Sequence, residues 1–268
     1  MMRISSVVLL GSAVAGCSIL VACSNSGGSS SQSSPQPTAT AAAAASPSTA
    51  TASPATSPTI SVSFTDIAGT YGEQDIRDEA QLGVFPTTTG AFRPNDPISR
   101  GDYVQWLVTA NNLYFADDST SQLRFPSTNE DTFLDVTPSS PYWKYVQALV
   151  DAGFVIGVDA THFAPDRPIT RQEMVAIKYQ VDAGQKATPD PNLTAQQISE
   201  LSDADQVAPI YVTAVYDDLN LNIAHNIGRI WGKTAYFHPT RQLTRAEAAI
   251  SLAEIGDKQV TDVLQSGQ

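Results

Sequence analysis

The pattern of hydrophobic and polar positions divides the chain into two unlike parts. Residues 4–22 form one apolar run, and residues 24–59 are small or polar with no hydrophobic periodicity. From about residue 64 onward, apolar side chains recur at helical spacing, as Val146, Leu149 and Val150 do, which places them on one face of a helix. The pattern therefore predicts a disordered stretch followed by a folded, mainly α-helical region.

Paired helices are expected at three places in the folded region. The earlier helix of each pair is predicted near residues 73–82, 141–152 and 207–219, and the later one over residues 99–113, 170–182 and 244–254. Each later helix opens with Ser or Thr followed three residues on by Asp or Glu, a capping box in which both side chains bond backbone amides. The caps are Ser99, Thr170 and Thr244, and their acids are Asp102, Glu173 and Glu247. A further short helix is predicted over residues 194–200.

One sequence pattern occurs three times with the same internal spacing. It reads Phe-x-Pro, three residues, Ile or Leu, Ser or Thr, Arg, any residue and an acid, and it starts at Phe92, Phe163 and Phe237. An earlier aspartate accompanies each copy, expected in the turn before the first helix: Asp66, Asp135 and Asp203. Because a repeated unit buries its apolar face only against its neighbours, we predict three packed helix-loop-helix repeats. Their expected bounds are residues 61–120, 121–193 and 194–268.

An arginine occupies the first helical position of each copy, at Arg100, Arg171 and Arg245. A cation at a helix N-terminus opposes the helix dipole and costs about a few tenths of a kcal/mol, so its recurrence indicates a further use. Two interpretations remain open. The arginine forms an ion pair with the nearby cap acid or the upstream aspartate, or it joins the free helix amides in binding a carboxylate or phosphate.

The N-terminal run has the features of an export signal, because Arg3 precedes a stretch of about 19 apolar residues. A transmembrane anchor is the alternative at this length. Leu20-Val-Ala-Cys23 resembles the lipobox of bacterial lipoprotein signal peptides. That resemblance implies a signal peptide over residues 1–22 and lipidation of Cys23, with Cys17 as a poorer second candidate. Residues 23–60 are then a disordered spacer between a lipid bilayer and the folded region.

The composition argues against several classes of function. The chain has 27 acidic and 15 basic residues, a formal net charge of −12, which disfavours a nucleic-acid-binding face. Its two cysteines and three scattered histidines predict neither a disulfide scaffold nor a metal centre. It has no nucleophile elbow, P-loop or His-Glu-x-x-His motif. We therefore predict no catalytic residue, metal or cofactor, and a glycan-processing enzyme is a disfavoured alternative.

The threefold pattern resembles the S-layer homology family. The resemblance rests on the Phe-x-Pro segments and on Ile98-Ser-Arg-Gly-Asp102, Ile169-Thr-Arg-Gln-Glu173 and Leu243-Thr-Arg-Ala-Glu247. It implies a pseudo-threefold helical bundle that binds cell-wall polysaccharide linked to peptidoglycan, often bearing pyruvate ketals. By the resemblance the three helix-start arginines contact the anion, with Ser99, Thr170 and Thr244 beside them, and the cap acids hold the loops. Tyr142 and Trp143 either stack on a sugar or belong to the core.

The copies depart from the family pattern in particular positions. The first has Gly101-Asp102 where the family usually has Ala-Glu, and the third has Gln242 and Leu243 in place of Pro and Ile. The second is closest to the pattern, and the departures put the third site in doubt. The expected function is that of an exported, membrane-anchored lipoprotein of the bacterial envelope that tethers membrane to wall. An accessory subunit that binds another envelope protein is the alternative.

Overall fold

The computed structural model describes residues 60–128, 130, 132–154, 157–186, 188–221 and 225–267. All of them belong to one compact unit, residues 53–268. The predicted signal peptide, Cys23 and all of the predicted spacer except Ile60 lie outside the described residues. In the described part of the chain, no helix is both long enough and apolar enough to cross a bilayer.

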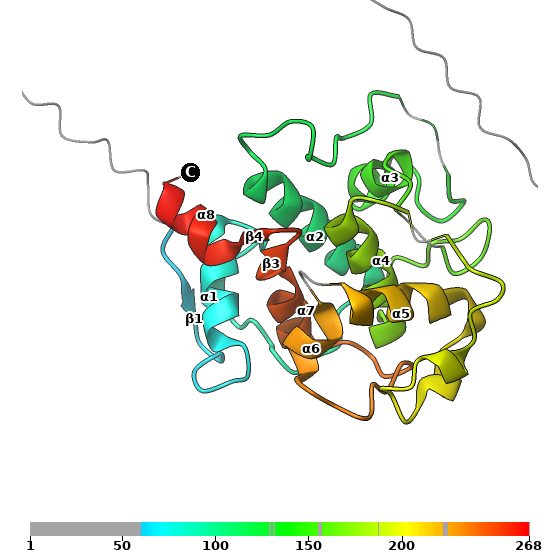
Figure 1. Cartoon of the computed structure of the whole chain (residues 1–268). Coiled ribbons are helices and arrows are strands. Elements are labelled where there is room, and N and C mark those ends of the chain that lie inside the picture. Colours follow the sequence, from blue (N-terminus) through cyan, green and yellow to red (C-terminus); the bar gives the residue numbers. More distant parts are fainter. Residues whose placement is uncertain are drawn as a thin grey trace, which may run out of the picture. The chain divides into compact units, whose positions relative to one another are not determined.

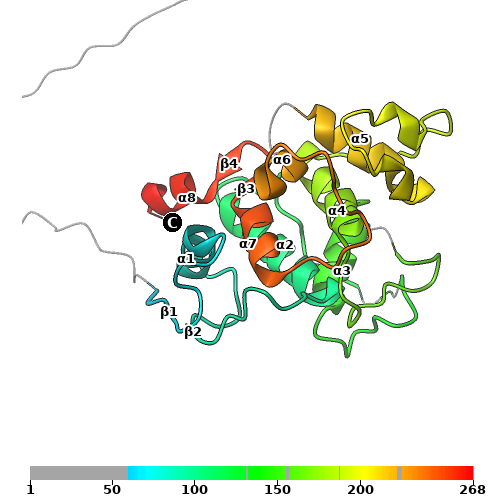
Figure 2. The same ribbon diagram turned by 90° about the horizontal axis from the view of Figure 1, so that it is seen from below.

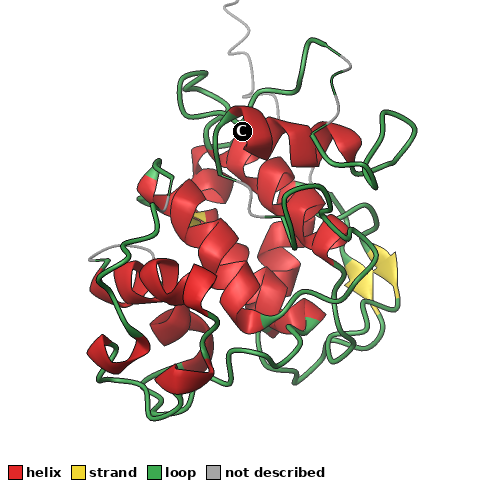
Figure 3. Cartoon of the chain, turned by 90° about the vertical axis from the view of Figure 1, so that its right-hand side faces the viewer, coloured by secondary structure: helices red, strands yellow, loops and turns green. Residues whose placement is uncertain are grey.

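Helices dominate the described region, which confirms the prediction of a mainly α-helical fold (Figure 3). Strand β1 (Ser63–Phe64) pairs in parallel with β2 (Thr89–Gly90), and β3 (Glu254–Ile255) pairs antiparallel with β4 (Lys258–Gln259). The elements in chain order are β1 (Ser63–Phe64), α1 (Glu73–Leu82), β2 (Thr89–Gly90), α2 (Arg100–Tyr114), α3 (Trp143–Asp151), α4 (Arg171–Ala183), η1 (Ala195–Gln197), η2 (Ala204–Gln206), η3 (Pro209–Tyr211), α5 (Val212–Asn220), α6 (Asn226–Trp231), α7 (Arg245–Leu252), β3 (Glu254–Ile255), β4 (Lys258–Gln259) and α8 (Val260–Ser266).

The helix starts agree closely with the sequence prediction. Helices α2, α4 and α7 each begin one residue after their predicted cap. Ser99 Oγ accepts the amide of Asp102 at 3.0 Å. Helix α1 has its predicted bounds, whereas α5 begins later than expected, because Pro209 opens a separate 3₁₀ turn, η3, before it. The helix predicted over residues 194–200 is one 3₁₀ turn, η1.

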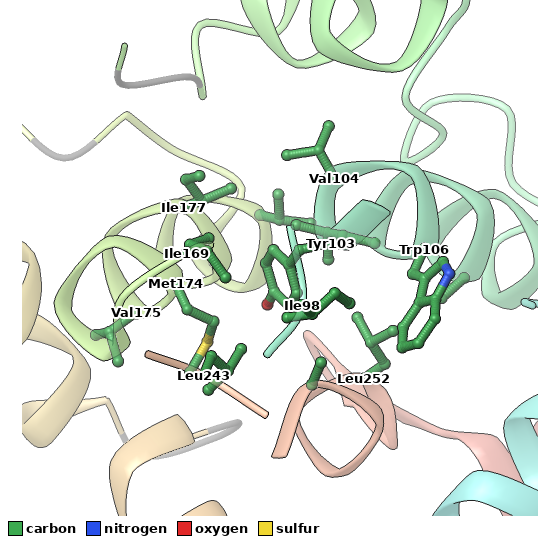
Figure 4. Packing of buried hydrophobic residues seen from close by; sticks show 14 of the residues in the cluster. Ile98, Tyr103, Val104, Trp106, Ile169, Met174, Val175, Ile177, Leu243 and Leu252 are labelled. Atoms are coloured by element: carbon green, nitrogen blue, oxygen red, sulfur yellow. The ribbon is translucent and has the colours of Figure 1, made fainter. Parts of the chain in front are cut away.

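The three copies meet at a common centre made by the apolar residue before each cap. The amide of Ile98 donates to the carbonyl of Leu243 at 3.0 Å, that of Ile169 to Ile98 at 3.0 Å, and that of Leu243 to Ile169 at 2.9 Å. These bonds form a closed cycle in which every copy donates once and accepts once. The three side chains are at most 1% exposed and lie in one cluster with Met174 and Tyr103 (Figure 4).

The C-terminal segment packs against the first helix. Helix α8 lies beside α1 in both views (Figures 1 and 2), and α1 also contacts α7. The β3–β4 hairpin that leads into α8 was not predicted, because two-residue strands are too short to produce a period-two pattern. The first copy is thus linked to the third at this end of the chain, as well as through the central cycle.

Candidate functional site

Each of the three aspartates of the earlier marker holds the Phe-x-Pro loop of its own copy. Both carboxylate oxygens accept backbone N–H groups, one from the Phe and one from the residue after it. The sets are Asp66 with Phe92 and Arg93, Asp135 with Phe163 and Ala164, and Asp203 with Phe237 and His238, at 2.7–2.9 Å. Sequence reasoning placed these aspartates before the first helix of each copy, but it did not identify the loop as their partner.

The residue after each Phe adopts a left-handed backbone conformation. The φ values are 58° at Arg93, 57° at Ala164 and 53° at His238, a region that costs a non-glycine residue about 1–3 kcal/mol. The aspartate bonds the amide of that residue and so stabilises the conformation. Burial opposes ionisation of Asp66, but the amides of Arg93 and Phe92 outweigh it and lower its pKa. The loops are therefore fixed in shape by carboxylate–amide bonds.

The helix-start arginines cross from one copy to the next. Each guanidinium donates to the carbonyl of the Phe in the following Phe-x-Pro loop: Arg100 to Phe163 at 2.9 Å, Arg171 to Phe237 at 2.9 Å and Arg245 to Phe92 at 2.7 Å. Each also lies over an aromatic ring, with Arg171 4.3 Å from the Trp231 centroid. Arg100 and Arg171 are 1% and 4% exposed. Arg100 and Arg171, two of the three predicted anion contacts, are therefore buried links between copies.

The first two amides of α2, α4 and α7 are also occupied. They donate to loop carbonyls of the following copy at 2.8–3.0 Å: Arg100 and Gly101 to Arg167 and Pro165, Arg171 and Gln172 to Arg241 and Pro239, and Arg245 and Ala246 to Asp96 and Pro94. The expectation that free helix amides help to bind an anion is therefore wrong. These partners come from other copies, which the local sequence around each cap does not show. Whether the arginine side chains contact a wall anion stays a prediction.

The cap acids mark three junctions, which we name by Asp102, Glu173 and Glu247. At the Glu173 junction the carboxylate lies 3.6 Å from Arg100, and at the Glu247 junction it accepts Arg171 at 2.6 Å. An ion pair of the arginine with the cap acid or upstream aspartate of its own copy was one expectation. Arg100 and Arg171 instead pair with the cap acid of the next copy. Burial raises the pKa of Glu173, but Arg167 and Arg100 outweigh it, and the net pKa is lowered.

The Asp102 junction is built differently. Aspartate is one methylene shorter than glutamate, and in the described residues no carboxylate lies within 4.0 Å of the Arg245 guanidinium, unlike its two counterparts. Asp102 instead accepts the Tyr142 hydroxyl at 3.0 Å. A Cβ at position 101 would lie 2.7 Å from the Tyr142 ring, so Gly101 is what lets the tyrosine approach. The two departures of the first copy from the family pattern therefore act together: Gly101 leaves space for the Tyr142 ring, and Asp102 accepts its hydroxyl.

Exposed side chains around the junctions were not singled out by sequence reasoning. The loop arginines Arg93, Arg167 and Arg241 have side chains 67%, 40% and 55% exposed. The Tyr71 and Tyr236 rings are also exposed. Arg167 and Arg241 share one position, four residues after the Phe, and this repeated spacing was the signal available in the sequence. Tyr142 and Trp143 pack against the core, and in the described residues no three His, Cys, Asp or Glu side chains could hold a metal.

Comparisons with known proteins agree with this geometry. The model of the S-layer homology domain matches residues 63–110 and 132–175. Both segments run from the aspartate marker into the capped helix, α2 or α4. A Surface-layer 125 kDa protein of Lysinibacillus sphaericus is 28% identical over 202 residues, which are 74% of this chain and 15% of that protein. The chain therefore spans only a small part of the length of this relative.

Proposed function

We propose that this chain is a non-catalytic envelope protein that binds an anionic, peptidoglycan-linked cell-wall polysaccharide and tethers a membrane to the wall. The S-layer homology match over two copies and a relative named as a surface-layer protein support an envelope location and a wall ligand. The third copy makes the same cyclic contacts as the first two, and we propose that it belongs to the same family.

The observation that carries the proposed ligand class is the Arg245 guanidinium at the Asp102 junction, which has no carboxylate within 4.0 Å in the described residues. Arg245 lies half-buried. Burial, together with repulsion from Arg93, lowers its pKa, although the more distant carboxylates of Asp102, Asp96 and Asp66 oppose this. A carboxylate on a sugar, such as a pyruvate ketal, supplies a negative partner for this guanidinium and can accept its paired N–H donors. In a chain of net charge −12, attraction of this kind is local and does not extend to a diffuse polyanion.

The junctions differ in what a wall anion would meet. At Glu173 and Glu247 a carboxylate of the protein already accepts the arginine, so an added anion competes with a buried ion pair. At the Asp102 junction no carboxylate lies within 4.0 Å of the Arg245 guanidinium in the described residues, whereas the exposed Arg93 has Asp96 at 3.7 Å. We therefore propose the Asp102 junction, with Arg245 and Arg93, as the main contact. The sequence, in contrast, put the site of the third copy, which includes Arg245, in doubt, because that copy departs from the family pattern at Gln242 and Leu243.

Binding to purified sacculi tests this function. We expect the full chain to co-sediment with sacculi and to lose binding after hydrofluoric acid removes the attached polysaccharide. Arg93→Ala removes an exposed donor to a charged ligand and should weaken binding about tenfold. Arg124→Ala, which removes an exposed arginine outside the junctions, should bind as the wild type does. Absence of binding to either preparation would contradict the proposal and favour a protein partner.

The membrane end of the proposed tether is lipidated Cys23. Because burial of an acyl chain contributes about 0.8 kcal/mol per CH₂, Cys23→Ser should move the protein from the membrane fraction to the soluble fraction. Cys17→Ser is the matched control and should stay with membranes. Mass spectrometry of the mature protein should find an acylated Cys23 as its first residue. A mature chain that retains residues 1–22 would favour a transmembrane anchor instead.

A further inference from the structure

A buried carboxyl group joins the first copy to the third. Glu79 on α1 is fully buried, as is Tyr114 at the end of α2. The Tyr114 hydroxyl oxygen lies 2.6 Å from Glu79 Oε1 and 2.8 Å from the carbonyl oxygen of Leu252, the last residue of α7. The other carboxyl oxygen, Glu79 Oε2, is buried and has no hydrogen-bond partner among the described residues. Glu79, Tyr114 and Leu252 thus form one buried polar cluster between α1, α2 and α7.

The number of protons in this cluster decides the charge of Glu79. A carbonyl oxygen only accepts, and a phenol has one proton to donate. If the Tyr114 hydroxyl donates its proton to the Leu252 carbonyl, no proton is left for its contact with Glu79. That contact is then a hydrogen bond only when the Glu79 carboxyl group supplies the proton. A neutral Glu79 therefore satisfies both contacts, whereas an ionised Glu79 leaves one contact between two acceptors and also buries an unpaired negative charge.

The charges around the cluster give the carboxylate little compensation. Burial raises the pKa of Glu79 well above its usual range, Asp75 and Asp78 on α1 add to the rise, and Tyr114 and Lys178 oppose it. Lys178 on α4 is itself paired with Asp182. The charged residues of α2 and α7 lie in their first turns, at the opposite ends from Tyr114 and Leu252, and Asp262 of α8 is exposed. Arg229 on α6 acts on Tyr114 from a distance.

We infer that Glu79 carries a proton in the folded protein at neutral pH, and that this proton makes the packing of α1 against the third copy sensitive to pH. Below the pKa of an unfolded glutamate, about 4.3, both states hold the proton and the stabilisation is complete. As the pH rises above that value, the unfolded chain releases the proton while the folded chain keeps it. Stability is therefore lost progressively until the pH passes the pKa of the folded state.

Comparison with Glu79→Gln tests the inference, because the glutamine amide donates to Tyr114 as the neutral acid does but does not titrate. Urea unfolding of the full chain at several pH values from 5 to 9 gives the two unfolding constants. The wild-type constant should rise relative to the variant's by at most about tenfold per pH unit. Glu73→Gln is the matched control, because Gly69 and Arg77 lower the pKa of this partly exposed glutamate on the same helix. Glu73 is then ionised in both the folded and the unfolded state from pH 5 to 9, so the ratio of the wild-type and Glu73→Gln unfolding constants should stay nearly constant across that range.

A measurement on the wild-type protein keeps the inference testable if Glu79→Gln does not fold. Carboxyl ¹³C resonances of glutamate should include one that stays in its neutral form at pH 7, where an unperturbed glutamate is ionised. A spectrum in which every glutamate carboxyl is ionised at pH 7 would overturn the inference. So would a constant ratio between the wild-type and Glu79→Gln unfolding constants across the pH range.

Discussion

Arg171→Ala is expected to lower the free energy of unfolding by about 3–5 kcal/mol. The guanidinium is 4% exposed and donates to the carbonyl of Phe237 and to the Glu247 carboxylate. Truncation leaves the buried Glu247 without its closest cation, and loss of one partner of a buried ion pair is costly. It also removes the contact with the Trp231 ring. Urea unfolding of the full chain, followed by tryptophan fluorescence, measures the change.

Arg241→Ala is the matched control for this prediction. Arg241 approaches the same Glu247 carboxylate at 4.0 Å, but its side chain is 55% exposed, and exposed ion pairs contribute at most about 1 kcal/mol. This variant should therefore keep nearly the wild-type unfolding midpoint. If Arg171→Ala is as stable as the wild type but no longer sediments with sacculi, Arg171 is a ligand contact and its role as a buried link between copies is refuted.

Binding experiments on Arg100 and Arg171 need a stability measurement beside them. Loss of binding in Arg100→Ala or Arg171→Ala does not by itself assign either residue to the ligand, because both are buried between copies. Arg245 and the exposed loop arginines are better probes. Arg93, in particular, has a side chain 67% exposed, so its removal changes the surface of a junction while the bonds between copies remain.

Features that depend on neighbouring residues were predictable from the sequence. A capping box acts within four residues, so α2, α4 and α7 begin where Ser99, Thr170 and Thr244 indicate. The three-copy pattern also indicated that each unit buries its apolar face against the others. The closed cycle of bonds between residues 98, 169 and 243 shows how that burial is arranged.

Features that depend on partners in another copy were not predictable in this way. Arg100 pairs with Glu173, 73 positions away in the chain, whereas sequence reasoning considered only the cap acid and the upstream aspartate of the arginine's own copy. Gly101 stood out in the sequence only as a departure from the family pattern, but the space that it leaves is filled by Tyr142 from the second copy. The charge state inferred for Glu79 likewise depends on α7, which no pattern around residue 79 indicates.

Asp203→Ala is the second variant for which a large effect is expected, a loss of about 3 kcal/mol or more of unfolding free energy. Its carboxylate is 3% exposed and accepts the amides of Phe237 and His238 at 2.9 and 2.7 Å. Hydrogen bonds to charged groups contribute about 1.5–3 kcal/mol each, and alanine supplies no acceptor. His238, with φ of 53°, also loses the bond that holds it in an unfavourable backbone conformation. Urea unfolding gives the size of the effect.

Amide hydrogen exchange locates that effect, because the amides of Phe237 and His238 should lose protection in Asp203→Ala before the rest of the third copy does. Asp203→Asn keeps one acceptor oxygen and should fall between Asp203→Ala and the wild type. Asp205→Ala is the matched control, since Asp205 is exposed two residues further along the chain, and its stability should stay within about 0.5 kcal/mol of the wild type. If both amides remain protected in Asp203→Ala, some other group holds the Phe-x-Pro loop, and the structural role assigned to all three aspartates is wrong.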